Sequence, residues 1–142
     1  MSVIKMFNNG TGVTVVSTQI DIPADGVIRS IAMGMQFEDA SPATGEGAQV
    51  ELSFLSVNTF AVNDARGSLC TVNHVVVFAD AARIVMSGTP FCILTPIAVS
   101  VAAGERIFMH GVGDSVSATW LATAYLFVDD GIDVARAQVR RR

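Results

Sequence analysis

Hydrophobic and polar residues alternate along most of the chain, with the period of two that is typical of half-buried β-strands. The alternation is clearest in the C-terminal half, where residues 99–101, 106–110 and 117–128 are separated by the turn segments Ala102–Glu105 and Gly111–Asp114. Further strands are predicted over 1–8, 13–22, 27–37, 49–62, 69–78 and 83–86. Turn signals recur at the spacing of about 8–12 residues that indicates an all-β sandwich or barrel.

The strand count and turn spacing predict an all-β, single-domain jelly-roll β-sandwich of about eight antiparallel strands. A weak internal echo between Ile20–Gly26 and Val99–Gly104 is compatible with two Greek keys. We expect three parts: residues 1–8 as an N-terminal arm or edge strand, 9–131 as the jelly-roll domain, and 132–142 as a basic tail. The acidic stretch 38–48, rich in Gly, Ser, Thr and Pro, is expected to be an exposed loop.

The last predicted strand is apolar on both faces. Trp120 shares one face with alanines and Leu126, whereas Leu121, Tyr125 and Phe127 share the other. Because successive side chains of a strand point to opposite sides, only one face can enter the core without a bulge. We expect one face in the core and the other at a subunit interface. The alternative is that another part of the same chain covers the second face.

Composition strengthens the expectation of an interface. The chain has 142 residues, of which 51% are hydrophobic and only 15% are charged, against about 25% charged in an average soluble domain. Apolar surface is therefore expected to remain after folding and to need a partner. No apolar run reaches the roughly 18 residues that span a bilayer, so no membrane association is expected. Without a signal-peptide pattern at its start, the chain is expected to be made in a host cytoplasm.

Charge is distributed unevenly. Residues 1–135 contain five basic and thirteen acidic side chains, for a net charge of −8, while Arg136, Arg140, Arg141 and Arg142 cluster at the end. The simplest interpretation of this tail is a solvated chain end, followed by docking on an acidic protein surface. Nucleic-acid binding ranks third, because the body is acidic and its aromatic residues follow core patterns.

The sequence contains no recognisable catalytic or metal-binding pattern. His74 and His110 are the only histidines, no Gly-x-Ser-x-Gly elbow is present, and both histidines are expected to be structural. Two histidines and two cysteines, widely spaced, match no zinc pattern. We therefore expect no enzyme activity, no cofactor and no metal. Cys70 and Cys92 are expected to be buried thiols, with a disulfide between neighbouring strands as the alternative.

The C-terminal half carries a family resemblance. Residues Ile97–His110, then Ala118–Trp120 and Tyr125–Val128, follow the order strand, small-Gly-Glu turn, strand, Gly/Asp loop and long last strand. This order resembles the closing strands of the trimeric jelly rolls of tailed-bacteriophage virions, namely head decoration (cement) proteins and small fibre heads. The resemblance implies a virion structural role and trimers, and it transfers no binding residues.

These observations predict a homotrimeric capsid decoration protein, located in the virion, that binds the major capsid protein or another virion protein. Docking is assigned first to the apolar arm, which can add a strand to a partner's sheet edge, and second to the arginine tail. The predicted partner-binding residues are Val3, Ile4, Met6, Phe7, Arg136, Arg140, Arg141 and Arg142. The alternative function is a carbohydrate- or receptor-binding head of a phage fibre, carried by the loops 38–48 and 63–68.

Overall fold

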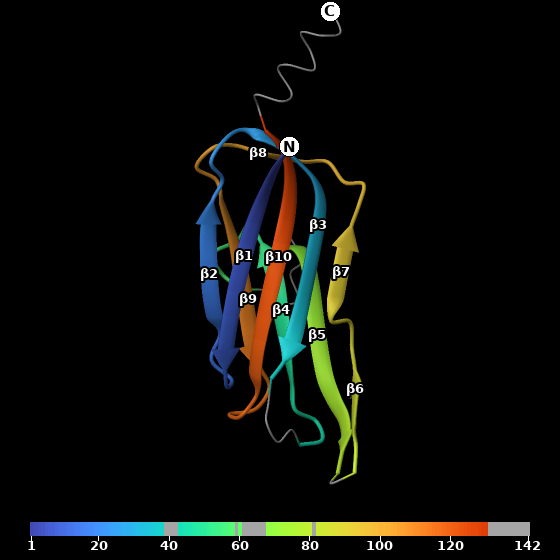
Figure 1. The fold of residues 1–142 in the computed structure, drawn as a ribbon. Coiled ribbons are helices and arrows are strands. Elements are labelled where there is room, and N and C mark those ends of the chain that lie inside the picture. Colours follow the sequence, from blue (N-terminus) through green and yellow to red (C-terminus); the bar gives the residue numbers. More distant parts are fainter. Residues whose placement is uncertain (39–42, 59, 61–67, 81, 131–142) are drawn as a thin grey trace, which may run out of the picture.

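The computed structural model describes residues 1–38, 43–58, 60, 68–80 and 82–130. In this part of the chain, ten antiparallel strands form two five-stranded sheets that face each other (Figure 1). The strands are β1 (Ser2–Thr11), β2 (Val16–Asp21), β3 (Gly26–Phe37), β4 (Gly47–Ser53), β5 (Ser68–Ala79), β6 (Ile84–Ser87), β7 (Phe91–Leu94), β8 (Val99–Val101), β9 (Arg106–Gly113) and β10 (Thr119–Asp130).

The connectivity is that of a jelly roll. Sheet A has the order β1-β10-β3-β7, with β8 also paired to β3, and sheet B has the order β2-β9-β4-β5-β6. β7 and β8 pair with successive stretches of the same strand, at 31–34 and 26–28 of β3, so they share one strand position. Eight principal positions therefore remain, and the short strand β6 extends sheet B. This confirms the predicted jelly-roll sandwich.

The core lies between the two sheets and is built from the inward residues of both. Trp120 is its largest fully buried side chain and is 1% exposed. Aliphatic and methionine side chains fill the remaining space. One polar residue joins them: Asn8, 6% exposed, donates from Nδ2 to the carbonyl oxygens of Val16 and Met109, each at 2.9 Å. Because these acceptors lie on β2 and β9, Asn8 ties the edge of sheet A to sheet B.

Three predicted boundaries are corrected by the structure. β1 continues to Thr11, because residues 2–11 pair with β10 throughout. β9 continues to Gly113, so the turn expected at Gly111–Asp114 begins later. The strand predicted over 49–62 ends at Ser53. On β3, Ile28 is fully buried while Val27 is only half-buried. The reason is a bulge: Arg29 is an extra residue between the pairs Ser30–Phe127 and Ile28–Val128, which reverses the alternation beyond it.

The two faces of β10 separate as the alternation predicts. Trp120, Ala122, Ala124 and Leu126 point into the sandwich and are at most 1% exposed. Tyr125, on the opposite face, is 39% exposed, and Leu121 and Phe127 on that face are half-buried. In the described part of the chain no strand covers this outer face, so its apolar residues lie on the surface of sheet A.

Candidate interaction surfaces

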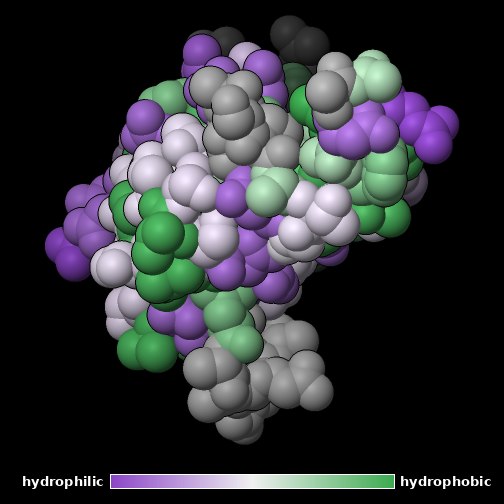
Figure 2. All heavy atoms as spheres, turned by 90° about the horizontal axis from the view of Figure 1, so that it is seen from below, coloured by the Kyte–Doolittle hydropathy of each residue, from purple (hydrophilic) through white to green (hydrophobic). Residues whose placement is uncertain are grey.

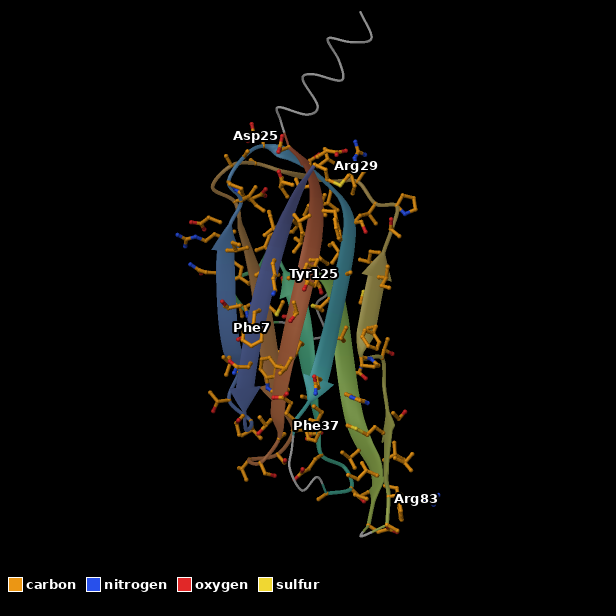
Figure 3. All side chains as sticks on the ribbon, viewed as in Figure 1. Phe7, Asp25, Arg29, Phe37, Arg83 and Tyr125 are labelled. Atoms are coloured by element: carbon orange, nitrogen blue, oxygen red, sulfur yellow. The ribbon has the colours of Figure 1, made fainter. Side chains whose placement is uncertain are left out.

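Exposed apolar side chains of β1, β7 and β10 gather on the outer side of sheet A, and we call this surface the apolar face. Val3 and Phe7 come from β1, Phe91 and Ile93 from β7, and three residues come from β10. Phe91 and Ile93 are 69% and 70% exposed, respectively. Figure 3 labels Phe7 and Tyr125 on neighbouring strands of the front sheet. The members are Val3, Phe7, Phe91, Ile93, Leu121, Tyr125 and Phe127.

Strand register arranges these residues in rows across the sheet. One row runs Lys5, Tyr125, Ala32 and Ile93 from β1 to β7, and the next runs Phe7, Thr123, Gly34 and Phe91. Small residues of β3 thus lie between larger side chains on either side. The Phe91 ring rests on Gly34, where an added Cβ would stand 3.2 Å from two ring atoms. The Phe91 ring therefore covers Gly34, and β3 contributes only small side chains to these two rows.

Charge is sparse on the apolar face. Lys5 is the charged residue within the two rows, and its ammonium nitrogen lies 5.9 Å from the centre of the Tyr125 ring. At one margin, Arg29 Nε donates to Asp129 Oδ2 at 3.0 Å, and both side chains are partly exposed. A pair this exposed contributes little to stability. The apolar character of the face is therefore interrupted by a single cation.

A second apolar surface lies on the hairpin of β5 and β6, which extends past the other strands at one end of the sandwich (Figure 1). Phe78 is 39% exposed and Ile84 is 51% exposed. The guanidinium carbon of Arg83 lies 5.2 Å from the centre of the Phe78 ring. Figure 2, which views this end of the molecule, shows hydrophobic and hydrophilic surface side by side. We call Val75, Val77, Phe78, Ile84 and Val85 the hairpin patch.

The predicted docking arm divides between surface and core. Val3 and Phe7 are 55% and 52% exposed and belong to the apolar face. Ile4 and Met6 point the other way and are 8% and 4% exposed, because they contribute to the core. Ile4 and Met6 therefore cannot contact a partner unless the sandwich opens, and their assignment to docking is corrected. The predicted tail residues Arg136, Arg140, Arg141 and Arg142 lie outside the described residues.

His110 lies on the outer side of sheet B and is 1% exposed. Its Nε2 is 2.8 Å from the carbonyl oxygen of Leu55, which can only accept, so Nε2 carries the proton in the neutral ring. Its Nδ1, 2.6 Å from Ser17 Oγ, then accepts from the hydroxyl. Glu51, also buried, is its cross-strand neighbour on β4. With both ring nitrogens bonded, His110 fastens the segment after β4 to sheet B.

Ser17 Oγ and His110 Nδ1 are placed like a nucleophile and its base, but the other ring nitrogen of His110, Nε2, is bonded to the Leu55 carbonyl oxygen and not to a carboxylate. A hollow of about 290 Å³ lies on sheet B and is lined in part by Gln49, Asn73 and Asp114. Two of these side chains are already used, since Asp114 accepts from the Gly47 N–H and Asn73 from the Thr89 N–H. In the described ranges, no three metal-binding side chains come together.

The structure also shows where the remaining candidates lie. His74 is half-buried and lies on the same side of β5 as the buried Cys70, Val72 and Val76. Cys70 is buried and Cys92 is half-buried, and both are free thiols. No helix of the described residues is long and apolar enough to cross a membrane.

Two surface elements were not singled out from the sequence. The hairpin patch has a signal in the run Val75–Phe78, four consecutive apolar residues where a half-buried strand would alternate. Phe91 and Ile93 were placed in a strand-rich stretch, but their exposure depends on β7 being the outermost strand of sheet A. No sequence pattern reports that position.

Comparisons with known proteins show no family and no curated relative: no family model matches the chain, and no curated protein matches it. Solved structures match at low identity. They include FLHE, at 13% identity over 89% of this chain and 96% of that one, with a TM-score of 0.38. The Eiger TNF from S. frugiperda matches at 8% identity over 89% and 94%, with a TM-score of 0.37. The capsid protein of BFDV matches at 10% identity over 89% and 96%, also with a TM-score of 0.37. These likenesses carry no argument about function.

Proposed function

We propose that this protein is a non-enzymatic virion structural protein of the capsid decoration type, which self-associates and stabilises a coat lattice. The observation that supports it best is the apolar face of sheet A. Its five most exposed members leave on the order of 500 Å² of apolar side chain open to solvent. The largest apolar patch on a typical monomer is about 300–600 Å², and a patch of that size is often a functional surface. Together with a polar rim, such a face can supply the roughly 800 Å² per partner of a stable interface.

A second copy of the chain is the occupant that this face suits. Its larger side chains on β1, β10 and β7 lie on either side of small residues of β3, so large apolar side chains of one copy can pack against this surface of another. Few charges need to lose their hydration, because Lys5 is the single charge within the rows. The trimer is the form implied by the resemblance to phage virion jelly rolls, and it is part of the proposal.

The hairpin patch is the proposed contact with the coat. It extends beyond the sandwich at the end shown in Figure 2, away from the rows of the apolar face. Its exposed Val77, Phe78 and Ile84 can enter an apolar groove of a coat subunit, while Arg83 beside Phe78 can meet an acidic rim. Val3 and Phe7 are reassigned from coat docking to the interface between copies.

A sugar-binding fibre head remains the second candidate from the sequence, and much of the two loops to which it was assigned, residues 39–42 and 63–67, lies outside the described residues. Sugar sites use exposed aromatic rings, but Trp120 is 1% exposed in the core and Tyr125 lies within the apolar face. The hollow on sheet B has polar lining residues and contains no aromatic side chain.

The molar mass in solution tests the proposal. Light scattering after size exclusion, at low and at moderate salt, should give three times 14.9 kDa in both buffers. Salt independence is expected because apolar burial, unlike ion pairing, is not screened. A monomer in both buffers would contradict self-association through the apolar face.

A further inference from the structure

Cys70 and Cys92 are far apart in the sheet order but face the same interior. Cys70 lies on β5 of sheet B opposite Leu52, and Cys92 lies on β7 of sheet A opposite Met33. Both cross-strand neighbours are core residues. Cys70 is 7% exposed, and Cys92 is half-buried and packs against the same core. The two thiols therefore approach each other from opposite sheets.

The side chains are close enough to influence each other. Burial raises the pKa of the Cys70 thiol, and the neighbouring Cys92 raises it further through its charge and a side-chain hydrogen bond. In Figure 1, β5 and β7 run next to each other along one side of the sandwich. Both sulfur atoms are unoxidised in this structure. What separates this pair from two unrelated core cysteines is their meeting across the gap between the sheets.

We propose that Cys70 and Cys92 form a redox pair that oxidises to a disulfide bond joining sheet A to sheet B. Thiols of a chain made in a reducing cytoplasm stay reduced, and release into an oxidising medium allows the bond to form. The compartment follows from the proposed virion role, whereas the chemistry depends only on the two side chains. The two thiols therefore form a site that small disulfides such as glutathione disulfide can oxidise.

Their exposure sets the order of the two steps. Cys92, the more accessible sulfur, attacks one sulfur of glutathione disulfide as a thiolate and forms a mixed disulfide, while one glutathione leaves as a thiolate and takes up a proton. Cys70 then gives up its proton and attacks the Cys92 sulfur, and the second glutathione leaves. Two protein thiols are oxidised and one glutathione disulfide is reduced to two molecules of glutathione. Cys70, with its raised pKa, is the resolving residue.

The bond would connect two strands that the fold otherwise holds together only by packing. β7 pairs with β3 in sheet A, and β5 pairs with β4 and β6 in sheet B. A cross-link between residues 70 and 92 restricts the unfolded chain and so raises the melting temperature.

The test uses the folded full chain, incubated at neutral pH with glutathione disulfide and analysed by mass spectrometry. Wild type should lose the mass of two hydrogens, yield a cross-linked peptide pair containing Cys70 and Cys92, and melt several degrees higher than before. Cys70→Ser should keep one glutathione on Cys92, because the resolving thiol is gone. Cys92→Ser, the matched control, should remain unmodified under the same conditions.

Two outcomes would overturn the pairing. One is wild type that keeps two free thiols after native treatment although the urea-unfolded chain forms the bond. The other is wild type that accumulates glutathione on Cys92 as stably as Cys70→Ser does, since this would mean that Cys70 cannot reach it. Light scattering of the double variant Cys70→Ser/Cys92→Ser keeps this result separate from the proposed function: self-association should be unchanged.

Discussion

The indole ring of Trp120 lies directly on the backbone of Gly111, so that a Cβ at position 111 would overlap its six-membered ring. Gly111 is on β9 of sheet B and Trp120 is on β10 of sheet A. The contact therefore sets how closely the two sheets approach at this point. Glycine is required here by space and not by backbone conformation.

Gly111→Ala is accordingly expected to lower the free energy of unfolding by about 2–3 kcal/mol, the usual cost of overpacking a core. In a Trp120→Phe background the smaller ring leaves room, so the same substitution should cost less than about 1 kcal/mol. Phe is a suitable replacement for Trp120, because Trp120 Nε1 has no hydrogen-bond partner to lose among the described residues. Urea denaturation of the four proteins measures the cycle, and equal costs in both backgrounds would contradict the overlap.

A second prediction concerns the hydrogen bonds of His110. Ser17→Ala removes the donor to Nδ1 and should cost about 1 kcal/mol, whereas His110→Ala also frees the Leu55 carbonyl and leaves a cavity, at about 3 kcal/mol. Gln19→Ala, on the same exposed side of β2, is the matched control and should stay within about 0.5 kcal/mol of wild type. If Ser17→Ala and Gln19→Ala are indistinguishable in urea, the Ser17 bond contributes nothing.

The raised pKa of Cys70 predicts a loss of stability in alkaline solution. Above its ordinary value of 9.0, the unfolded chain releases this proton while the folded protein keeps it. The unfolded state then binds fewer protons, so the free energy of unfolding falls as pH rises, by at most about 1.4 kcal/mol per pH unit for one group. Under reducing conditions, wild type should therefore lose stability from pH 9 upward more steeply than Cys70→Ala. Parallel slopes would contradict the assignment.

Self-association should depend on the outermost strand of sheet A. The double variant Phe91→Ser/Ile93→Ser replaces two side chains that are about 70% exposed, so its fold should keep its stability while its molar mass falls to that of a monomer. Val13→Ser/Val116→Ser is the matched control, because those valines are 56% and 82% exposed away from the apolar face. A trimer that survives the first pair of substitutions would exclude β7 from the interface.

The hairpin patch gives a separate prediction. Phe78→Ser/Ile84→Ser should abolish cosedimentation with the virus particles to which the proposed function assigns the protein, while the molar mass of the free protein is unchanged. Val3→Ser/Phe7→Ser should do the reverse if β1 contributes to the interface between copies. Particle binding and molar mass are measured for both variants on the same preparations. Each prediction can therefore be contradicted independently of the other.

Much of the fold could be predicted because the strands obey a local rule. Alternation divided β10 into the two faces that the structure shows, with Trp120 and Leu126 buried on one and Tyr125 exposed on the other. Strict alternation breaks at β3, where the bulge at Arg29 leaves Ile28 buried and Val27 half-buried. A bulge depends on the pairing with the partner strand, so it cannot be predicted from the residues of one strand alone.

The interaction surfaces were harder to predict because they depend on which strands are neighbours. Val3, Ile4, Met6 and Phe7 were grouped as one apolar arm, yet pairing with β10 sends two of them into the core and two to the surface. Cys70 and Cys92 were expected to be buried thiols, but their meeting across the two sheets depends on topology and not on spacing in the chain. Alternation within one strand indicates which residues share a face of the sheet. An interaction site depends in addition on which distant strands lie side by side.

The pairing of β1 with β10 also governs how the protein is made. These two strands are the first and the last of the sandwich, so β1 has no partner until residue 130 has left the ribosome. Throughout synthesis, the core residues Ile4 and Met6 remain exposed in the nascent chain. A translation product that stops before β10 lacks Trp120 as well as the neighbour of both β1 and β3. Sheet A therefore cannot form before β10 is available, and a product that stops before β10 cannot build the sheet that carries the apolar face.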